Sequence, residues 1–283
     1  MELGLKGKVA IVTGAGQGVG EQIAKSLAQE GVKVVVNDLF LDRAQRVAGE
    51  IKAAGGEAIA VKADVANGEE VNEMVNKTVS EFGRVDILVN NAGVPAPGPE
   101  GDPLASQALF FAQTDKSSWD KFVGLNLYGT MNCTRAVIEH MIKQNSGKIV
   151  SIISDAGRVG EPRMCSYAAG KAGIVGFTKS LAKEVGRNCI NVNCVSLGAT
   201  PHPGLEERQK ALIGAIGIPA EQLEQEMERR RGAMVRVYPL ARGLGRFGLP
   251  SDAANAVVFF ASDAAAWITG QVLSVDGGYC MVS

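Results

Sequence analysis

Tyr167 and Lys171 stand four residues apart in the segment SYAAGKAGIVGFTK. On a helix this spacing places both side chains on one face, so that the phenol and the ammonium can approach each other. A phenol, whose ordinary pKa is about 10, is a poor base at neutral pH, but an adjacent ammonium favours the phenolate. The pair could therefore serve as a general base, although a tyrosine and a lysine also meet by chance on many helices.

A glycine-rich turn follows the first apolar run of the chain. Gly14, Gly18 and Gly20 lie in the segment TGAGQGVGEQIAKSLAQ, directly after the apolar run 9–12. Such a turn can lead into a helix whose free N–H groups hold a pyrophosphate. Glycines also serve ordinary strand-to-helix corners, so the turn predicts a dinucleotide site mainly through its position after the first strand.

Asp38 ends the second apolar run, eighteen residues beyond Gly20. A carboxylate at this place can accept hydrogen bonds from both hydroxyls of an adenosine ribose. A 2'-phosphate would instead meet a negative charge, and neither Gln17 nor Leu39 supplies a compensating cation. The pattern favours NAD over NADP, although an acid at a strand end can also be a solvated turn residue.

The elements that must position these residues alternate regularly along the chain. Apolar runs of strand length suit a parallel sheet covered on both faces, and helix-length amphipathic segments separate them. The runs are 9–12, 32–36, 58–61, 85–89, 148–153, 190–195 and 271–275. The helical segments are 18–30, 41–54, 68–82, 118–144, 164–186 and 251–262. This alternation predicts an α/β fold with a Rossmann-like, doubly wound, mainly parallel seven-stranded sheet.

The 283 residues suffice for one large α/β domain, and we expect a single domain over 1–283. Two stretches interrupt the alternation: 94–117, which is rich in proline, and 199–248, which is helix-like but interrupted by glycines. We expect both to be excursions that enlarge the substrate side of the sheet, because loops at the carboxyl ends of parallel strands form the ligand crevice.

Composition and charge limit the classes of molecule that we expect this protein to bind. Twenty-nine basic and thirty acidic side chains leave a formal net charge of -1, which offers no field for nucleic acid or an anionic membrane. The five cysteines form no Cys-x-x-Cys motif and only two histidines occur, so we expect no metal site. The N-terminus lacks a signal-peptide pattern and no apolar stretch approaches membrane-spanning length. We expect a cytoplasmic protein whose partners are small molecules.

Taken together, these motifs resemble the short-chain dehydrogenase/reductase family over nearly the whole chain. The residues that carry the resemblance are Thr13 to Gly20, Asp64 and Val65, Asn90 to Gly93, Asn126, Ser154, Tyr167 with Lys171, and the closing VDGGY from Val275. So many motifs in order and at the family's spacing make the resemblance specific.

The resemblance implies a catalytic role for four residues. Tyr167 would remove the alcohol proton, and Lys171 would lower the phenol pKa and hold the nicotinamide ribose. Ser154 would hydrogen-bond the substrate oxygen, and Asn126 would position a water that leads protons away from Lys171. Ser151 is a rival for the serine role, but we favour Ser154, which lies thirteen residues before Tyr167, because Ser151 would fall within a strand.

The resemblance also implies how the cofactor is held. Asp64 and Val65 would bind the adenine, and Asn91 to Gly93 would shape the loop beneath the cofactor. Leu197 stands where the family often has proline, which should loosen the turn that grips the carboxamide, although Thr200 could still contact it. The predicted cofactor-binding residues are Gly14, Gln17, Gly18, Val19, Gly20, Asp38, Leu39, Asp64, Val65, Asn91, Ala92, Gly93, Tyr167, Lys171, Gly198 and Thr200.

Substrate-side features are less specific. Phe110 and Phe111 could line an apolar pocket or belong to a self-packed loop. Arg158 and Arg163 flank the segment from Ser154 to Tyr167 and could select an anionic substrate. Arg229 to Arg231 could meet an anion, but neighbouring glutamates favour a solvated helix face. His202 could touch substrate or simply belong to a turn.

The prediction for function is an NAD-dependent oxidoreductase that interconverts a secondary alcohol and its ketone. Its substrate would be fairly large and partly apolar, such as a cyclic alcohol or a hydroxyacyl thioester. The alternatives are an NADPH-dependent ketoreductase of the 3-oxoacyl type and a non-catalytic NAD-binding subunit or sensor. Because the family commonly pairs the helix at 164–186 and the one at 118–144 between protomers, we expect a homotetramer, with a dimer second. Gly170, Gly173 and Gly176 would permit such close packing.

Overall fold

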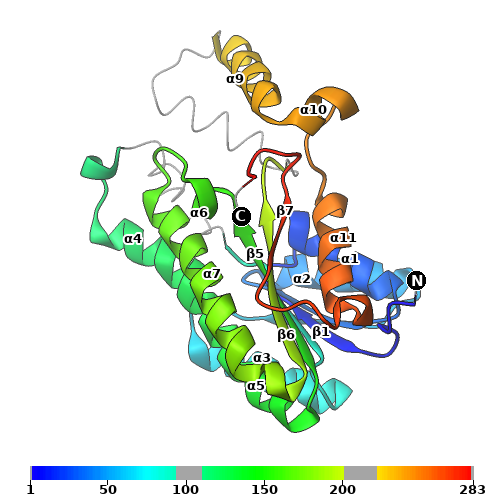
Figure 1. The fold of residues 1–283 in the computed structure, drawn as a ribbon. Helices are drawn as coiled ribbons and strands as arrows, with labels where there is room; N and C mark the ends of the chain where they lie inside the picture. The colour runs from blue at the N-terminus through cyan, green and yellow to red at the C-terminus, as the bar shows by residue number, and fades with distance from the viewer. Residues whose placement is uncertain (1, 94–109, 201–221, 282–283) are drawn as a thin grey trace.

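The computed structural model describes residues 2–93, 110–200 and 222–281 (Figure 1). The predicted excursions therefore lie partly outside the described residues, at 94–109 and 201–221, and so does His202.

A seven-stranded sheet in the order β3-β2-β1-β4-β5-β6-β7 forms the centre of the fold, and each pair of neighbouring strands is parallel. The strands are β1 (Val9–Val12), β2 (Lys33–Asp38), β3 (Ala58–Lys62), β4 (Ile87–Asn90), β5 (Gly147–Ser154), β6 (Ile190–Leu197) and β7 (Val272–Val275). The strand order reverses between β1 and β4, which creates a crevice at the carboxyl ends of the strands. The predicted doubly wound sheet is confirmed.

Helices cover both faces of this sheet, with α1, α2 and α11 on one face and α3, α5 and α7 on the other (Figure 1). The longer helices are α1 (Gly18–Gln29), α2 (Leu41–Ala53), α3 (Gly68–Phe82), α4 (Lys116–Val123), α5 (Gly129–Gln144), α7 (Cys165–Val185), α9 (Leu223–Val237) and α11 (Pro250–Ala261). The shorter ones are α6 (Ala156–Val159) and α10 (Pro239–Leu244). In β1, Ala10 and Val12 face one core and Ile11 the other, which explains why the strands are apolar throughout.

The segment predicted as one helix over 118–144 is divided in the structure. A π-helical turn at Gly124–Tyr128 separates α4 from α5. Within it, the side chain of Asn126 donates from Nδ2 to the carbonyl oxygen of Phe122 at 2.9 Å. A one-turn π-bulge of this kind often marks a functional position in a helix, and here it fixes the orientation of the Asn126 amide.

The glycines of α7 explain how that helix packs against the π-helical turn. A β-carbon at Gly170 would lie 3.1 Å from the β-carbon of Asn126, and one at Gly173 would lie 3.0 Å from a methyl of Leu127. These two glycines therefore permit close packing within the chain, while a β-carbon at Gly176 would meet nothing within 4 Å.

Helices α9 and α10 lie beyond the carboxyl ends of the strands, on the side where a ligand crevice is expected (Figure 1). Among the described helices, none combines the length and the apolar character needed to cross a membrane.

Candidate active site

A cavity of about 510 Å³ lies at the carboxyl ends of the strands. Every residue predicted to bind the cofactor lines it, from Gly14 in the glycine turn to Thr200 after β6, and so does Ser154. Of the predicted site residues, only Asn126 lies behind the wall. The sequence prediction missed further lining residues, namely Asn37, Phe40, Arg43, Ala63, Leu125, Ile152, Ile153 and Leu197.

The glycine turn requires glycine for two different reasons. Gly14 and Gly18 have φ of 59° and 60°, a left-handed conformation that side chains disfavour. Gly20 has ordinary φ but no room, since a β-carbon there would lie 2.3 Å from the Asn91 amide nitrogen and 2.4 Å from the Gly14 carbonyl oxygen. The turn thus leads into α1 with the backbone exposed to the cavity, as a pyrophosphate site needs.

Asn91 supports the same turn from the end of β4. Its amide nitrogen donates to the carbonyl oxygens of Thr13 at 2.9 Å and Gly14 at 3.0 Å. The neighbouring Asn90 points into the sheet instead, where its amide nitrogen donates to the hydroxyl of Ser151 at 3.3 Å. Asn91 therefore positions the cofactor loop, while Asn90 and Ser151 are buried structural partners.

Asp38 ends β2 with its carboxylate in the cavity wall, and its side chain is almost fully buried. The carboxylate accepts hydrogen bonds from the backbone N–H of Gly16 at 2.9 Å and of Phe40 at 3.1 Å. A β-carbon at Gly16 would lie 2.6 Å from the carboxylate, so the glycine turn and Asp38 fit each other closely. At the other adenine-side position, Asp64 accepts a hydrogen bond from the N–H of Ala66 at 2.9 Å.

Arg43, on α2, is the cation that sequence inspection of Gln17 and Leu39 missed. Its guanidinium lies 4.4 Å from the centre of the Phe40 ring and donates to the side-chain oxygen of Gln17 at 3.3 Å. The signal was present in the sequence, because position 43 lies in the first turn of the helix that follows Asp38. The surroundings of Asp38 therefore include a positive charge that the sequence prediction did not consider.

Ser154 and Tyr167 meet at the far end of the cavity. Ser154 is the last residue of β5, and its hydroxyl is hydrogen-bonded to that of Tyr167, near the start of α7. Partial burial of the phenol raises the Tyr167 pKa, and the Ser154 hydrogen bond acts in the opposite direction. The net direction is opposite to the one expected from a nearby ammonium alone, because desolvation is the largest cause and outweighs the Ser154 hydrogen bond.

Lys171 is buried beneath Tyr167, with its Nζ 5.8 Å from the centre of the phenol ring. The Nζ donates to the carbonyl oxygen of Ile152 at 2.8 Å. Burial lowers the pKa of Lys171 to about 8, which leaves the amine mostly protonated at neutral pH. The predicted helical pairing of phenol and ammonium is present, but the ammonium reaches the backbone of β5 and not the phenol oxygen.

Asn126 and Lys171 approach each other behind Gly93. A β-carbon at Gly93 would lie 2.7 Å from the Lys171 Nζ and 2.8 Å from the Asn126 side-chain oxygen. That oxygen is buried without a hydrogen-bond partner among the described residues. The glycine of the Asn90–Gly93 motif thus leaves room for the Lys171 ammonium and the Asn126 oxygen, and one water between them can hydrogen-bond to both.

The loop after β6 is held by an aromatic side chain far away in sequence. The Tyr238 hydroxyl accepts a hydrogen bond from the backbone N–H of Ala199 at 3.1 Å. The Tyr238 ring stacks on Tyr279 with centroids 4.9 Å apart and meets the edge of Phe247 at 5.9 Å. These contacts substitute for the rigidity that Leu197, in place of proline, was expected to remove.

The proposed anion-selecting arginines have other partners. Arg158 donates to the hydroxyl of Ser274 on β7, and the Arg163 guanidinium lies 4.8 Å from the Phe110 ring centre. Neither lines the cavity in the described part of the chain. Phe110 is 64% exposed, which is compatible with an apolar pocket lining. Phe111 stacks on Trp119 with ring centroids 5.2 Å apart, which is compatible with a self-packed loop. Arg229 pairs with Glu226 at 2.7 Å, which favours the solvated helix face.

Comparisons with known proteins agree with this geometry. Residues 8–212 match the profile of the family described as short chain dehydrogenase. The chain is 38% identical over 279 residues to a 3-oxoacyl-[acyl-carrier-protein] reductase of Synechocystis sp., covering 98% of each chain. It is 33% identical over 274 residues to the corresponding reductase of Thermotoga maritima, covering 97% of this chain and 98% of the relative.

Solved structures give the same result. A 7α-hydroxysteroid dehydrogenase complexed with NADH and 7-oxo glycochenodeoxycholic acid has a TM-score of 0.79 and 34% identity, covering 98% of this chain and 96% of its own. A hydroxysteroid dehydrogenase from Escherichia coli has a TM-score of 0.78 and 31% identity, covering 99% of each chain.

The chain therefore belongs to the short-chain dehydrogenase family. Within that family it is an oxidoreductase that acts on a small-molecule substrate.

Proposed function

We propose that the protein interconverts a secondary alcohol and its ketone with NAD(H), using Tyr167 as the general base. The observation that carries the proposal is the meeting of Ser154, Tyr167 and Lys171 at one end of the cavity, with Asp38 in the wall at the cofactor end. We further propose that residues 1–283 form one domain.

The chain's own residues supply the proton chemistry. Tyr167 takes the proton from the alcohol oxygen, and Ser154 donates a hydrogen bond to that oxygen as negative charge develops on it. A bound nicotinamide would supply the acceptor for the hydride of the carbinol carbon, so that the alcohol would lose one proton and one hydride in all. Asn126 positions a water that leads the proton away from Lys171 and out of the site, and in reduction each transfer reverses.

Asp38 supports NAD as the cofactor. Its carboxylate is fixed by two backbone N–H groups and still has lone pairs for ribose hydroxyls, whereas a 2'-phosphate would be repelled. The similarity to a dehydrogenase solved with NADH points in the same direction.

The relatives and two exposed aromatic side chains support the proposed class of substrate. The named relatives act on 3-oxoacyl thioesters and hydroxysteroids, both of which are large and partly apolar. The exposed aromatic side chains of Phe110 and Phe111 suit such a molecule.

The test is absorbance at 340 nm with NAD, NADP and their reduced forms against cyclic alcohols, hydroxysteroids, hydroxyacyl thioesters and the matching ketones. Turnover with NAD(H) on one chemical group is the expected result. The Tyr167→Phe variant should bind the cofactor and lose about 10²- to 10⁴-fold in turnover, the usual contribution of a general acid-base. Binding without turnover in the unaltered protein across the whole panel would instead support a non-catalytic NAD sensor.

A second candidate is an NADPH-dependent reductase of the 3-oxoacyl type. Arg43 in the cavity wall and the 38% identical relative favour it. Calorimetry with NAD and NADP separates the two, because Asp38→Ala should relax a preference for NAD, while Arg43→Ala should weaken NADP more than NAD only if Arg43 meets a 2'-phosphate. Preference of the unaltered protein for NADPH would overturn the assignment of NAD.

We also propose a homotetramer, with a dimer as the second choice. Tyr128, at the start of α5, and Met131 and Ile142 on that helix are large apolar side chains that remain 58%, 39% and 40% exposed in one chain. Light scattering after size exclusion should give the mass of four chains, and a purely monomeric protein would contradict the proposal.

A further inference from the structure

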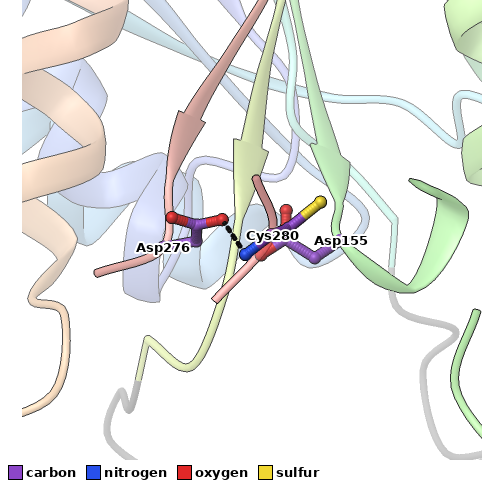
Figure 2. A group of neighbouring side chains, drawn as sticks. All are labelled: Asp155, Asp276 and Cys280. Atoms are coloured by element: carbon purple, nitrogen blue, oxygen red, sulfur yellow. Dashed lines mark hydrogen bonds between the residues drawn. The ribbon is translucent and has the colours of Figure 1, made fainter. Parts of the chain in front are cut away.

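Behind the active site, Asp155, Asp276 and Cys280 form a buried cluster whose side-chain heteroatoms lie within 4.8 Å of one another (Figure 2). The three side chains are only 2%, 8% and 4% exposed. Asp155 directly follows the catalytic Ser154, whereas Asp276 and Cys280 belong to the turn that follows β7. The cluster therefore joins the end of the serine strand to the C-terminal turn.

The hydrogen bonds of the two carboxyl groups are unequal. Asp276 accepts from the backbone N–H of Gly278 at 3.0 Å and of Cys280 at 2.8 Å, so each of its two oxygens has a donor. Asp155 accepts from the Ser196 hydroxyl at 2.6 Å through Oδ1, while its Oδ2 is buried and receives no hydrogen bond from any described donor. A carboxylate oxygen in that position is costly, and a proton on it would turn it into a donor toward Asp276.

We infer that Asp155 is a positioning residue, which shares one proton with Asp276 and so couples Ser154 and the loop after β6 to the C-terminal turn. Two buried carboxylates at this separation cannot both ionise without strong repulsion, and one shared proton removes it.

The charged and titratable groups around Asp155 and Asp276 determine the pH range in which the shared proton is bound. Burial, as the largest cause, and the nearby Asp276 carboxylate together raise the pKa of Asp155 to about 6, against the Ser196 hydroxyl and the Arg158 guanidinium, which act to lower it. Glu161, Tyr238 and Tyr279 face the same cluster, and Tyr279 donates from its hydroxyl to Glu161. Arg158 is thus the one cation among the described groups that act on Asp155.

The proton matters for the active site because the cluster contacts two neighbouring segments, the loop after β6 and α10. Ser196 lies two residues before Gly198, and a β-carbon at Gly198 would lie 2.9 Å from the Asp276 β-carbon. The carbonyl oxygen of Gly277 accepts from the N–H of Leu240, in α10, at 3.0 Å. Loss of the shared proton would make Asp155 and Asp276 repel each other, and a shift of the C-terminal turn would reach the loop after β6 through Gly198 and α10 through Leu240.

The sign of the pH effect follows from the raised pKa. The proton stabilises the closed turn fully below the ordinary pKa, and this stabilisation is lost as the pH rises through the folded-state value. The ordinary pKa is 3.8 and the folded-state pKa is about 6. By linkage, the equilibrium constant for opening of the C-terminal turn therefore increases about four-fold when the pH rises from about 5.5 to 7.5.

Hydrogen exchange tests the inference without turnover. In the unaltered protein, exchange of residues 276–281, corrected for intrinsic rates, should become about four-fold less protected over that pH interval. Asp155→Asn keeps a donor toward Asp276 at every pH, so its protection should stay constant. Asp120→Asn, which alters an exposed carboxylate on α4, should behave like the unaltered protein.

A kinetic measurement adds the link to the active site and rests on the proposed function. The substrate KM of the unaltered protein should rise over the same pH interval relative to that of Asp155→Asn, with kcat little changed. Absence of turnover in the unaltered protein would contradict the proposed function but leave the exchange result intact.

Two results would overturn the inference. One is an equal pH dependence of exchange in Asp155→Asn and in the unaltered protein. If that variant does not fold, NMR spectra of the unaltered protein with ¹³C-labelled aspartate replace it. Absence of any carboxyl group that titrates near pH 6 in those spectra would then overturn the inference. The other is stoichiometric binding of Zn²⁺ that Cys280→Ser abolishes, because two carboxylates and a thiol would then hold a cation in place of the proton.

Discussion

Lys171 donates a hydrogen bond from its Nζ to the carbonyl oxygen of Ile152 at 2.8 Å, across the boundary between α7 and β5. The ammonium is thereby fixed below the phenol of Tyr167, with a β-strand carbonyl as its hydrogen-bond acceptor. Because β5 also ends in Ser154, one strand orients both the lysine and the serine of the site.

Replacing Lys171 with methionine should abolish turnover and change the pH dependence of stability. Burial lowers the lysine pKa from 10.5 to about 8, so the folded protein releases this proton at lower pH than the unfolded chain does. The free energy of unfolding of the unaltered protein therefore gains about 3 kcal/mol from this group between pH 8 and 10.5. Lys171→Met lacks that gain, which urea unfolding of both proteins at pH 7 and 10 can measure.

The matched control for this prediction is Lys116→Met, because the Lys116 side chain is 79% exposed. Its stability difference from the unaltered protein should not change with pH in the same interval. A constant difference for Lys171→Met as well would mean that the lysine is not buried as a cation.

Much of this site could be predicted from local patterns. Strand ends and helix starts follow from apolar periodicity, so the positions of Asp38, Ser154 and Tyr167 were correctly expected to face one crevice. The choice of Ser154 over Ser151 rested on the family's spacing to Tyr167 and on the expected strand, and the structure places Ser151 in the interior of β5 and Ser154 at its last residue.

The remainder depends on contacts between distant segments, which one sequence does not reveal. The direction of the Tyr167 pKa was misjudged because desolvation depends on what α4 and β5 pack around the phenol. The Tyr238 contact with Ala199 joins residues 39 positions apart, and nothing local marks it. Arg43 was overlooked because only the residues beside Asp38 were considered, although a helix brings the next turn equally close.

Gly93→Ala should impair the site without removing any functional group. The new methyl would lie 2.7 Å from the Lys171 Nζ and 2.8 Å from the Asn126 oxygen, so the lysine must move. Overpacking of this kind costs about 1–3 kcal/mol, and turnover should fall more than cofactor affinity. Gly49→Ala on α2, where a β-carbon meets nothing within 4 Å, should be neutral or stabilising by about 0.5–1 kcal/mol. Thermal unfolding and steady-state kinetics on both variants would show whether the effect is specific to Gly93.

Ser154→Ala and Ser151→Ala should separate catalysis from stability. Loss of the Ser154 hydroxyl removes a donor to the substrate oxygen, for which a decrease in kcat of about 10²- to 10³-fold is typical. Ser151 is buried against Asn90, so its removal should cost about 1–3 kcal/mol of stability, because the Asn90 amide keeps its hydrogen bond to Thr134 but loses the one to Ser151. Kinetics and urea unfolding on the pair would refute the assignment if Ser151→Ala alone lost turnover.

Tyr238→Phe should weaken the grip on the nicotinamide end of the cofactor and leave the adenosine end unaffected. The phenylalanine ring can keep the stacking on Tyr279, but the N–H of Ala199 loses its acceptor at 3.1 Å. A net hydrogen bond of this kind is worth about 0.5–1.5 kcal/mol, which corresponds to a few-fold to ten-fold loss of affinity for the dinucleotide. ADP-ribose, which has the adenosine and pyrophosphate but no nicotinamide, serves as the internal control. Calorimetry should show unchanged affinity for ADP-ribose and weaker binding of NAD, because we propose that the loop of Gly198 to Thr200 holds the nicotinamide side of the cofactor. Equal losses for both ligands would mean that Tyr238 supports the cavity as a whole and that the Ala199 hydrogen bond does not position this loop.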